Sequence, residues 1–243
     1  FINEMGKNNI TIINSEFSDK NERNKMRLSS RGLTMNDTYN IKDIFPNLRI
    51  GSAVTISLNG TIPKNTNKEI GVLGIDDSFW QLSQYHLQKG RWFSKIEQYD
   101  NAQVCVLGSE AARALFAFEN PLHQDIKINN LWFRVIGIMK PKPAAKNPEL
   151  SLTHINDNIH IPLFTAIKKF GKNPFFPQLS LIRIQAPHEA NLSHYKDVLS
   201  RMIKRLHRNT EDFSLTIAEE LIEQEQKTLG VFHIVMGAIA AIS

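Results

Sequence analysis

The stretch LSLIRIQAPHEANLSHYKDVLSRMIKRLHRNTEDFSLTI, residues 179–217, indicates the fold more clearly than any other part of the chain. Its centre carries apolar side chains at helical spacing, at Leu192, Tyr195, Val198, Leu199, Met202, Ile203 and Leu206. This recurrence predicts an amphipathic helix with one buried stripe. Apolar residues at 179–184 and 213–217 predict a strand on each side of it. The stretch therefore predicts a β-α-β unit.

A second unit of the same kind is predicted near the start, over residues 9–58. NITII, residues 9–13, is β-branched and predicts a strand. Thr34 stands three residues ahead of Asp37, a capping-box spacing that starts a short helix ending before Pro46. A strand then runs into Asn59-Gly60, which is the favoured pair for a two-residue hairpin turn. Together the two units predict an α+β fold, a split arrangement of helices on one sheet.

The residues between the units predict a mixed α/β insertion over 91–175 with a small core of its own. Before it, Ser78 and Gln81 have capping-box spacing and predict a helix through Leu87. Within it, a buried strand is predicted at 104–107, followed by a helix that Ser109 caps. A further pair of strands turns at Asn129-Asn130. The discontinuous outer unit then comprises residues 1–90 and 176–217.

The composition argues against several classes of function. The 243 residues carry a net charge of +5, but the basic residues are scattered, without the aromatic-interleaved stripe of a nucleic-acid interface. The densest patch, residues 204–208, ends the predicted helix, where cations favour the helix dipole. Cys105 is the only cysteine, which excludes an internal disulfide and a multi-cysteine zinc site. Its apolar neighbours predict a core position.

The two ends of the chain differ in character. Residues 1–6 lack the charged start and long apolar stretch of a signal peptide. From Leu229 the chain reads LGVFHIVMGAIAAIS, which is shorter than the ~20 residues of a membrane span. We interpret residues 218–243 as a polar helix that leads into the first part of a membrane helix. The alternative is an amphipathic helix packed on the domain.

Sequence motifs of catalysis are absent. The chain has no P-loop, no G-x-S-x-G elbow and no H-E-x-x-H, so no enzymatic activity and no bound cofactor are expected. The histidine pairs His154/His160 and His188/His194 have a spacing that places the rings on different faces of a helix, so no metal site is predicted. Asp76-Asp77 resembles a carboxylate pair, but Asp77 is interpreted as a helix cap.

Six segments, in order, resemble one transporter family. They are MGKNNITII (5–13), RGLTMNDTYNIKDIFPNLR (31–49), LQKGRWFS (87–94), VCVLGSEAARALF (104–116), NPLHQDIKINNLWFRVIGIM (120–139) and IHIPLFTAIKKF (159–170). Together they resemble the periplasmic core domain of MacB-type ABC transporter permeases, and the apolar tail is similar to the start of that family's second membrane helix. One departure is His123, where the family usually has glycine, so this turn is expected to be built differently.

The resemblance implies a porter-like subdomain at 1–90 and 176–217, a sabre-like insert at 91–175, and a stalk over 218–243. It further implies a bacterial inner-membrane parent with a cytoplasmic ATPase that uses ATP and Mg, and a domain facing the periplasm. This domain would couple ATP hydrolysis to periplasmic movement and export, with an adaptor protein and an outer-membrane channel. The full-length protein would be a homodimer, whereas this fragment is expected to be a monomer that binds no nucleic acid.

The contact residues and the cargo are less well defined. Trp92, Phe93 and Trp132 are candidates for partner binding, and the alternative is that they are core aromatics. A lipoprotein-releasing or cell-division type permease with a separate ATPase chain is the alternative function. A free-standing hydrolase is a third reading that the missing motifs disfavour. Drugs, peptides, toxins, siderophores and lipoproteins all remain open as cargo.

Overall fold

The computed structural model describes residues 8–15, 30–58, 70–117, 119–142, 155–171, 177–187 and 191–217. Within these ranges the chain forms ten strands and six α-helices. The strands are β1 (Asn9–Asn14), β2 (Arg49–Ile56), β3 (Gly71–Ile75), β4 (Leu87–Gly90), β5 (Val104–Leu107), β6 (Asp125–Ile128), β7 (Leu131–Met139), β8 (Asn158–Pro162), β9 (Leu181–Gln185) and β10 (Phe213–Ile217). The helices are α3 (Met35–Ile44), α4 (Asp77–Leu82), α5 (Lys95–Tyr99), α6 (Ser109–Phe116), α7 (Leu163–Phe170) and α8 (Leu192–Leu206).

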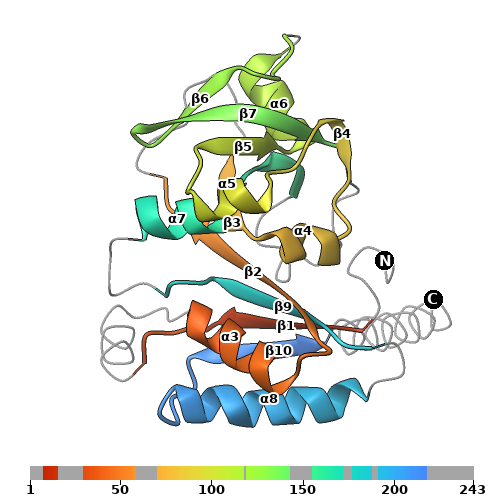
Figure 1. Cartoon of the computed structure of the whole chain (residues 1–243), viewed down its shortest axis with the longest axis vertical. Helices are drawn as coiled ribbons and strands as arrows, with labels where there is room; N and C mark the ends of the chain where they lie inside the picture. The colour runs from red at the N-terminus through yellow and green to blue at the C-terminus, as the bar shows by residue number, and fades with distance from the viewer. Residues whose placement is uncertain are drawn as a thin grey trace, which may run out of the picture.

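All ten strands belong to one mixed sheet, in the order β10-β1-β9-β2-β3-β8-β5-β7-β4, with β6 paired to β7. Parallel pairs (β3 with β8, β5 with β7) occur beside antiparallel ones. The prediction of a mixed α and β fold is therefore confirmed. The molecule is elongated: α8 lies at one end, and the β6–β7 hairpin and α6 lie at the other (Figure 1).

The predicted pair of β-α-β units is present in the half that contains α8. The units β1-α3-β2 and β9-α8-β10 interleave, so β1 lies between β10 and β9, and β9 lies between β1 and β2. Both helices pack on one core with the strands. It includes Ile10, Ile41, Ile184, Leu199 and Ile203, each fully buried. Most of the apolar stripe read from the sequence of α8 thus faces the sheet, but its last member, Leu206, is 43% exposed, so the prediction that it is buried is wrong.

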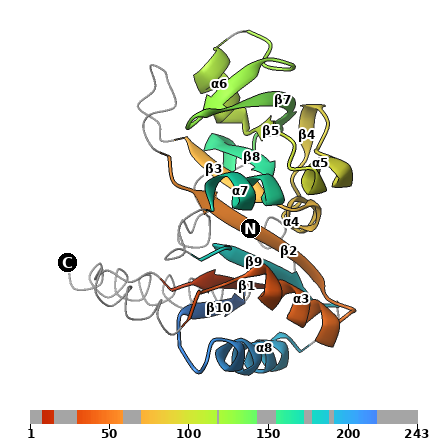
Figure 2. The ribbon, with the colours of Figure 1, turned by 60° about the vertical axis from the view of Figure 1, so that its left-hand side comes forward.

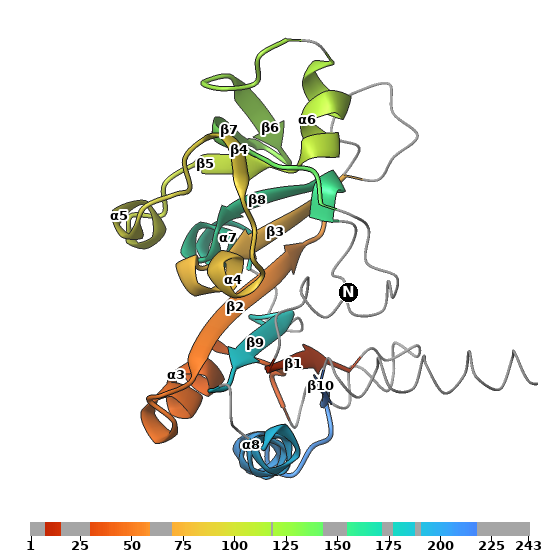
Figure 3. The same cartoon turned by 90° about the vertical axis from the view of Figure 1, so that its right-hand side faces the viewer.

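The strand β2 joins the two halves of the sheet (Figures 2 and 3). It pairs with β9 through its first part and with β3 through its second. Its side chains alternate between two faces: Ile50 and Val54 pack in the core of α3 and α8, whereas Ala53 packs with Phe79 of α4. The sheet is continuous across this strand, and the subdomain boundaries at residues 90 and 176 stay a prediction.

The start of α4 differs from the sequence prediction. The N-cap is Asp76, whose Oδ1 accepts from Phe79 N at 2.6 Å and whose Oδ2 accepts from Ser52 N at 2.8 Å. The predicted capping box of Ser78 with Gln81 and the predicted cap role of Asp77 are therefore wrong. The helix also ends at Leu82 instead of continuing to Leu87, which begins β4. Asp76 is the N-cap because its carboxylate accepts hydrogen bonds from a backbone N–H of the helix (Phe79) and from one of the neighbouring strand (Ser52).

Two other local expectations are settled by the structure. The N-cap of α6 is Gly108, so Ser109 is the first helical residue and not the cap. His123 adopts φ 67, a region that favours glycine, and its N–H donates to Val135 O at 2.8 Å. The family's glycine position therefore has a left-handed conformation here although it carries a side chain. The predicted Asn59-Gly60 turn and the predicted stalk at 218–243 lie outside the described residues.

Candidate functional site

The first feature with a functional consequence is the pairing of the first and last described strands. Strands β1 and β10, the first and last described strands, pair antiparallel with Ile10 opposite Ile217. The start of β1 and the end of β10 therefore lie at the same end of the sheet. Displacement of either end acts on two strands that are hydrogen-bonded to each other.

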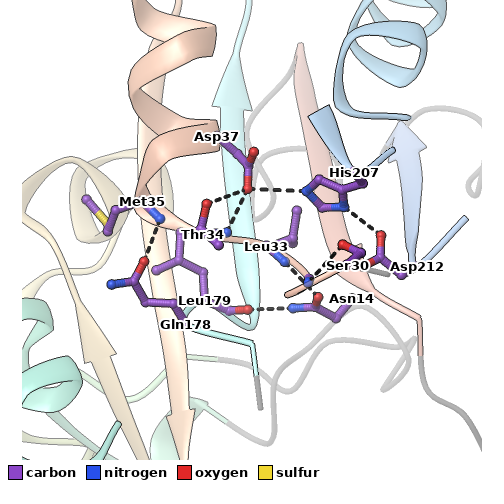
Figure 4. Close-up of polar contacts among 11 residues, drawn as sticks. Asn14, Ser30, Leu33, Thr34, Met35, Asp37, Gln178, Leu179, His207 and Asp212 are labelled. Atoms are coloured by element: carbon purple, nitrogen blue, oxygen red, sulfur yellow. Dashed lines mark hydrogen bonds and ion pairs between the residues drawn. The ribbon is translucent and has the colours of Figure 1, made fainter. Parts of the chain in front are cut away.

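A buried polar bridge ties these terminal segments together (Figure 4). His207 is the C-cap of α8; its Nδ1 lies 2.6 Å from Asp212 Oδ1 and its Nε2 lies 3.3 Å from Asp37 Oδ2. All three residues are almost fully buried. Burial by itself lowers the pKa of His207, but the hydrogen bonds and charges of Asp212 and Asp37 outweigh it and raise the pKa to about 9. The ring is therefore protonated at neutral pH and donates to both carboxylates.

Local sequence explains how the three side chains meet. Asp37 is held in the first turn of α3, where Thr34 N and Thr34 Oγ1 donate to its Oδ2 at 2.7 and 2.8 Å. After α8, Arg208 and Asn209 take left-handed backbone conformations with φ 55 and φ 61, which turn the chain into β10. The bridge thus links the start of α3, the end of α8 and the approach to β10. A buried cation between two carboxylates strongly favours this one arrangement of the three segments.

A second set of hydrogen bonds surrounds the far end of β1 (Figure 4). Asn14 Oδ1 accepts from Leu33 N at 3.0 Å, and Asn14 Nδ2 donates to Leu179 O. Gln178 Oε1 accepts from Met35 N at 2.9 Å. These bonds fix the entry to α3 and the entry to β9 against the first strand. The end of β1, the start of α3 and the start of β9 are therefore joined by side-chain hydrogen bonds in addition to the sheet.

The sequence interpretation missed this bridge. It assigned residues 204–208 to the helix end as a patch of cations, and in the structure Lys204 pairs with Glu211 at the surface as such a patch would. His207, in contrast, points inward to two carboxylates. The available signal was Asp212, five residues beyond a histidine that ends a helix, but Asp37 is 170 residues away and only the fold brings it near.

Of the three predicted partner-binding residues, two lie in an aromatic cluster. Trp92 stacks on Trp80 with ring centroids 4.9 Å apart and meets Phe93 edge-on at 5.8 Å. Phe93 is buried, and Trp92 is half-buried. Beside them lies His160 of β8, fully buried against the rings of Trp92 and Tyr85. Burial lowers the pKa of His160 to about 4, and the backbone of Ile155 offsets only part of this effect.

The third candidate, Trp132, lies apart on the outer face of β7. Its side chain is 61% exposed, and it stands opposite Lys127 of β6. On the same hairpin, Arg134 donates from Nε to Asp125 Oδ1 at 3.0 Å. Of the three tryptophan and phenylalanine candidates, Trp132 alone presents most of its side chain to solvent. Partner binding by any of them stays a prediction.

Within the described ranges, no group of three or more histidine, cysteine, aspartate or glutamate side chains is arranged to hold a metal ion. The helices α3 to α8 are too short or too polar for any of them to cross a membrane.

Sequence comparison identifies relatives over most of the chain. The profile of the MacB-like periplasmic core domain family matches residues 2–201. The macrolide export ATP-binding/permease protein MacB of Aggregatibacter actinomycetemcomitans is 25% identical over 245 residues, covering 100% of this chain and 36% of that protein. The pyoverdine export ATP-binding/permease protein PvdT of Pseudomonas aeruginosa is 28% identical over 172 residues, covering 70% of this chain and 25% of that protein. The chain thus spans about a third or less of these relatives.

Structure comparison agrees with the sequence match. The periplasmic region of MacB from Actinobacillus actinomycetemcomitans superposes with a TM-score of 0.71 at 20% identity, covering 93% of this chain and 95% of that one. The extracellular domain of the noncanonic ABC-type transporter YknZ from Gram-positive bacteria superposes with a TM-score of 0.65 at 16% identity, covering 86% and 100%. These two likenesses bear on the fold, and the family profile covers most of the chain. The chain belongs to the family of MacB-like periplasmic core domains.

Proposed function

We propose that this chain is the periplasm-facing domain of an inner-membrane ABC exporter that couples cytoplasmic ATP hydrolysis to movement in the periplasm. The ATPase, with its ATP and Mg, would belong to other parts of the parent protein, and the parent would act as a homodimer. The domain itself would transmit force and bind partners, without catalysing a reaction. Family membership and the names of the export relatives support this proposal.

One structural observation carries the coupling role. The two ends of the described domain are neighbours in the sheet, at Ile10 and Ile217, and the His207 bridge fixes the end of α8 and the approach to β10 to α3. A displacement that enters through the terminal segments is therefore passed to the whole outer unit, because its members are joined by hydrogen bonds and a shared core. If the two terminal strands lay at opposite ends of the domain, a pull on one of them could instead be absorbed by deformation of the segments between them.

The first test is to read the open reading frame on both sides of this segment. The proposal expects a P-loop ATPase domain and one apolar helix upstream, with membrane helices downstream that begin near Leu229. Membrane helices without an ATPase would favour the lipoprotein-releasing or cell-division type of permease. A signal peptide upstream and a stop codon directly after Ser243 would contradict both.

The second test measures movement in the full-length protein. A spin label at Arg201→Cys, on the exposed side of α8, reports the distance between the two copies in a homodimer. Burial raises the pKa of the native Cys105 thiol and hides it from reagents, so Cys105 need not be removed. The distance is expected to change when a non-hydrolysable ATP analogue binds. An unchanged distance in a protein that hydrolyses ATP would refute coupling through this domain.

We assign the binding of a periplasmic adaptor, which would lead to an outer-membrane channel, to the hairpin that carries Trp132. This hairpin lies at the end of the molecule opposite α8 (Figure 1), and its tryptophan is the most exposed of the predicted contacts. Trp132→Ser is expected to weaken adaptor binding at least about tenfold while thermal stability stays unchanged. Trp80→Phe, in the half-buried stack, is the matched control and should leave binding unaltered. Equal adaptor affinity in Trp132→Ser would exclude the hairpin.

A further inference from the structure

The short helix α5 presents two large apolar side chains to solvent. Ile96 is 72% exposed and Tyr99 is 70% exposed, the highest values among the large hydrophobic residues described. The two are three residues apart, so they lie on one face of the helix. The ring of Tyr99 continues onto Phe164 of α7, with ring centroids 5.4 Å apart and an interplanar angle of 23°. The result is a small apolar surface shared by α5 and α7.

This surface is held rigidly in spite of its exposure. A five-residue helix has little stability of its own, so its position depends on contacts with the rest of the protein. The buried side chain of Gln98 donates from Nε2 to Ile75 O at 2.8 Å and accepts from Leu163 N at 2.9 Å through Oε1. It therefore ties α5 to the end of β3 and to the first residue of α7.

Further contacts fix the two ends of α5. Ser94 and Glu97 form a capping box at its start, and Arg91 donates to both carboxylate oxygens of Glu97 at 2.7 and 2.8 Å. Beyond its end, Thr165 Oγ1 donates to Ala102 O at 3.0 Å. A helix that is fixed at both ends and in the middle loses little conformational entropy when a partner binds to it. Rigid display of apolar groups is a property of docking surfaces.

The charges around the apolar surface define the partner. Lys95 precedes Tyr99 by four residues and Lys168 follows Phe164 by four residues, so each lysine shares a helix face with one ring. Both lysines are exposed, and within the described ranges neither forms an ion pair. The carboxylate of Glu97 is engaged by Arg91, and Asp100, the C-cap residue four positions beyond Ile96, is an exposed carboxylate at the end of this helix. The rim beside the two rings is positive.

We infer that the surface formed by Ile96, Tyr99 and Phe164, with Lys95 and Lys168 at its rim, docks an amphipathic segment of a partner protein whose apolar side chains are flanked by carboxylates. The apolar side chains of the partner would cover Ile96 and the Tyr99–Phe164 stack. Its carboxylates would pair with the two lysines. This surface lies on α5 and α7, separate from the β6–β7 hairpin, and the inference holds whether or not the hairpin binds an adaptor.

The test uses three synthetic helical peptides that have the same leucine face and differ only in their flanking residues, which are glutamate, serine or lysine. Binding of each labelled peptide to the full chain is followed by fluorescence anisotropy. The glutamate-flanked peptide is expected to bind about five- to tenfold more tightly than the lysine-flanked one, because two exposed ion pairs are exchanged for two repulsions. Equal affinity for the three peptides would overturn the inference.

Variants of the chain make the test specific. The double change Lys95→Glu and Lys168→Glu is expected to reverse the preference in favour of the lysine-flanked peptide. Ile96→Ser with Tyr99→Ser should lower the affinity for the glutamate-flanked peptide at least about tenfold. Tyr39→Ser, at an exposed position of α3, is the matched control and should bind as the wild type does. Since all the substituted side chains are exposed, thermal unfolding should be unchanged and a loss of binding is not a loss of fold.

Two other occupants would each contradict the inference. One is a membrane surface, which would be revealed if vesicles containing phosphatidylglycerol bound the chain through Ile96 and Tyr99 while the peptides were not distinguished. The other is a second copy of the chain, which would be revealed by a dimer in sedimentation that Ile96→Ser abolishes.

Discussion

The buried histidine of β8 makes this domain sensitive to acid. His160 is fully buried, and neither ring nitrogen has a hydrogen-bond partner of good geometry among the described residues. A charge on this ring would be surrounded by the aromatic side chains of Tyr85 and Trp92. Burial therefore lowers the pKa of His160 to about 4 from its ordinary value of 6.5.

The size of the effect follows from the two pKa values. The unfolded chain takes up a proton at about pH 6.5, whereas the folded protein resists it until about pH 4. The stability contributed by the neutral ring is fully present above pH 6.5 and is lost as the pH falls toward 4. At about 1.4 kcal/mol for each tenfold change in proton affinity, the loss is about 2.5 kcal/mol at pH 4.5 and about 3 kcal/mol below pH 4.

The assay is the free energy of unfolding in urea at pH 7.5, 6.5, 5.5 and 4.5, for the wild type and for His160→Leu. Leucine has nearly the volume of histidine and does not titrate, so the difference between the two proteins isolates this one group from the carboxylates. The stability of His160→Leu relative to the wild type should rise by about 2.5 kcal/mol between pH 7.5 and 4.5. His86→Leu, at an exposed position nearby, is the control and should show no such change.

A difference between His160→Leu and the wild type that stays constant over this range would refute the reasoning. It would mean that the ring is protonated in the folded state without penalty, through water or a partner that stabilises the cation. A constant difference of either sign would still measure the packing change, which is independent of pH.

Three other predictions concern different parts of the fold. Because its pKa is raised, His207 is expected to contribute about 3 kcal/mol of stability below pH 6.5 that is lost as the pH rises through 9, and His207→Gln should abolish this loss. Urea unfolding at pH 6 and pH 10 measures the loss, and an equal loss in both proteins would contradict the bridge. Leu199→Ala should lower the free energy of unfolding by about 2–5 kcal/mol, since the side chain is fully buried in α8; a loss below about 1 kcal/mol would contradict its place in the core. Gly51→Ala should cost about 1–3 kcal/mol, because the added Cβ would lie 2.5 Å from Phe79 Cα; an unchanged thermal midpoint would show that α4 can move away from β2.

Strong periodic patterns predicted the elements well. The stripe of α8, the short helix from Met35 to Ile44 and the strand at 104–107 were all expected from spacing and caps, and all are present. Such patterns are reliable because each reports which face of one element is apolar. The choice of N-cap between two adjacent residues was less reliable. Asp76 and Asp77 have the same side chain, and only the position of Ser52 N in the fold favours Asp76 as the cap of α4.

The candidate sites were harder to predict than the elements. Trp92, Phe93 and Trp132 are all large aromatic residues that the sequence does not distinguish. In the structure, Trp92 and Phe93 lie in an aromatic cluster, whereas Trp132 is exposed on a hairpin. The solvent exposure of Ile96 and Tyr99 was not predicted either, because apolar residues in a short helix are ordinarily assigned to the core. Their exposure depends on the path of the chain between α4 and β5.

By itself the sequence determined the α and β composition, the two β-α-β units and the family, because these depend on local spacing and on ordered motifs. Only the tertiary structure decided that the first and last described strands are neighbours, that His207 is a buried cation and that His160 is a buried neutral ring. The reason is physical: the charge state of a histidine depends on its burial and on its partners, and the partner Asp37 is distant in sequence. The fold brings such groups together, and the local pattern of residues does not predict a contact between positions so far apart in the sequence.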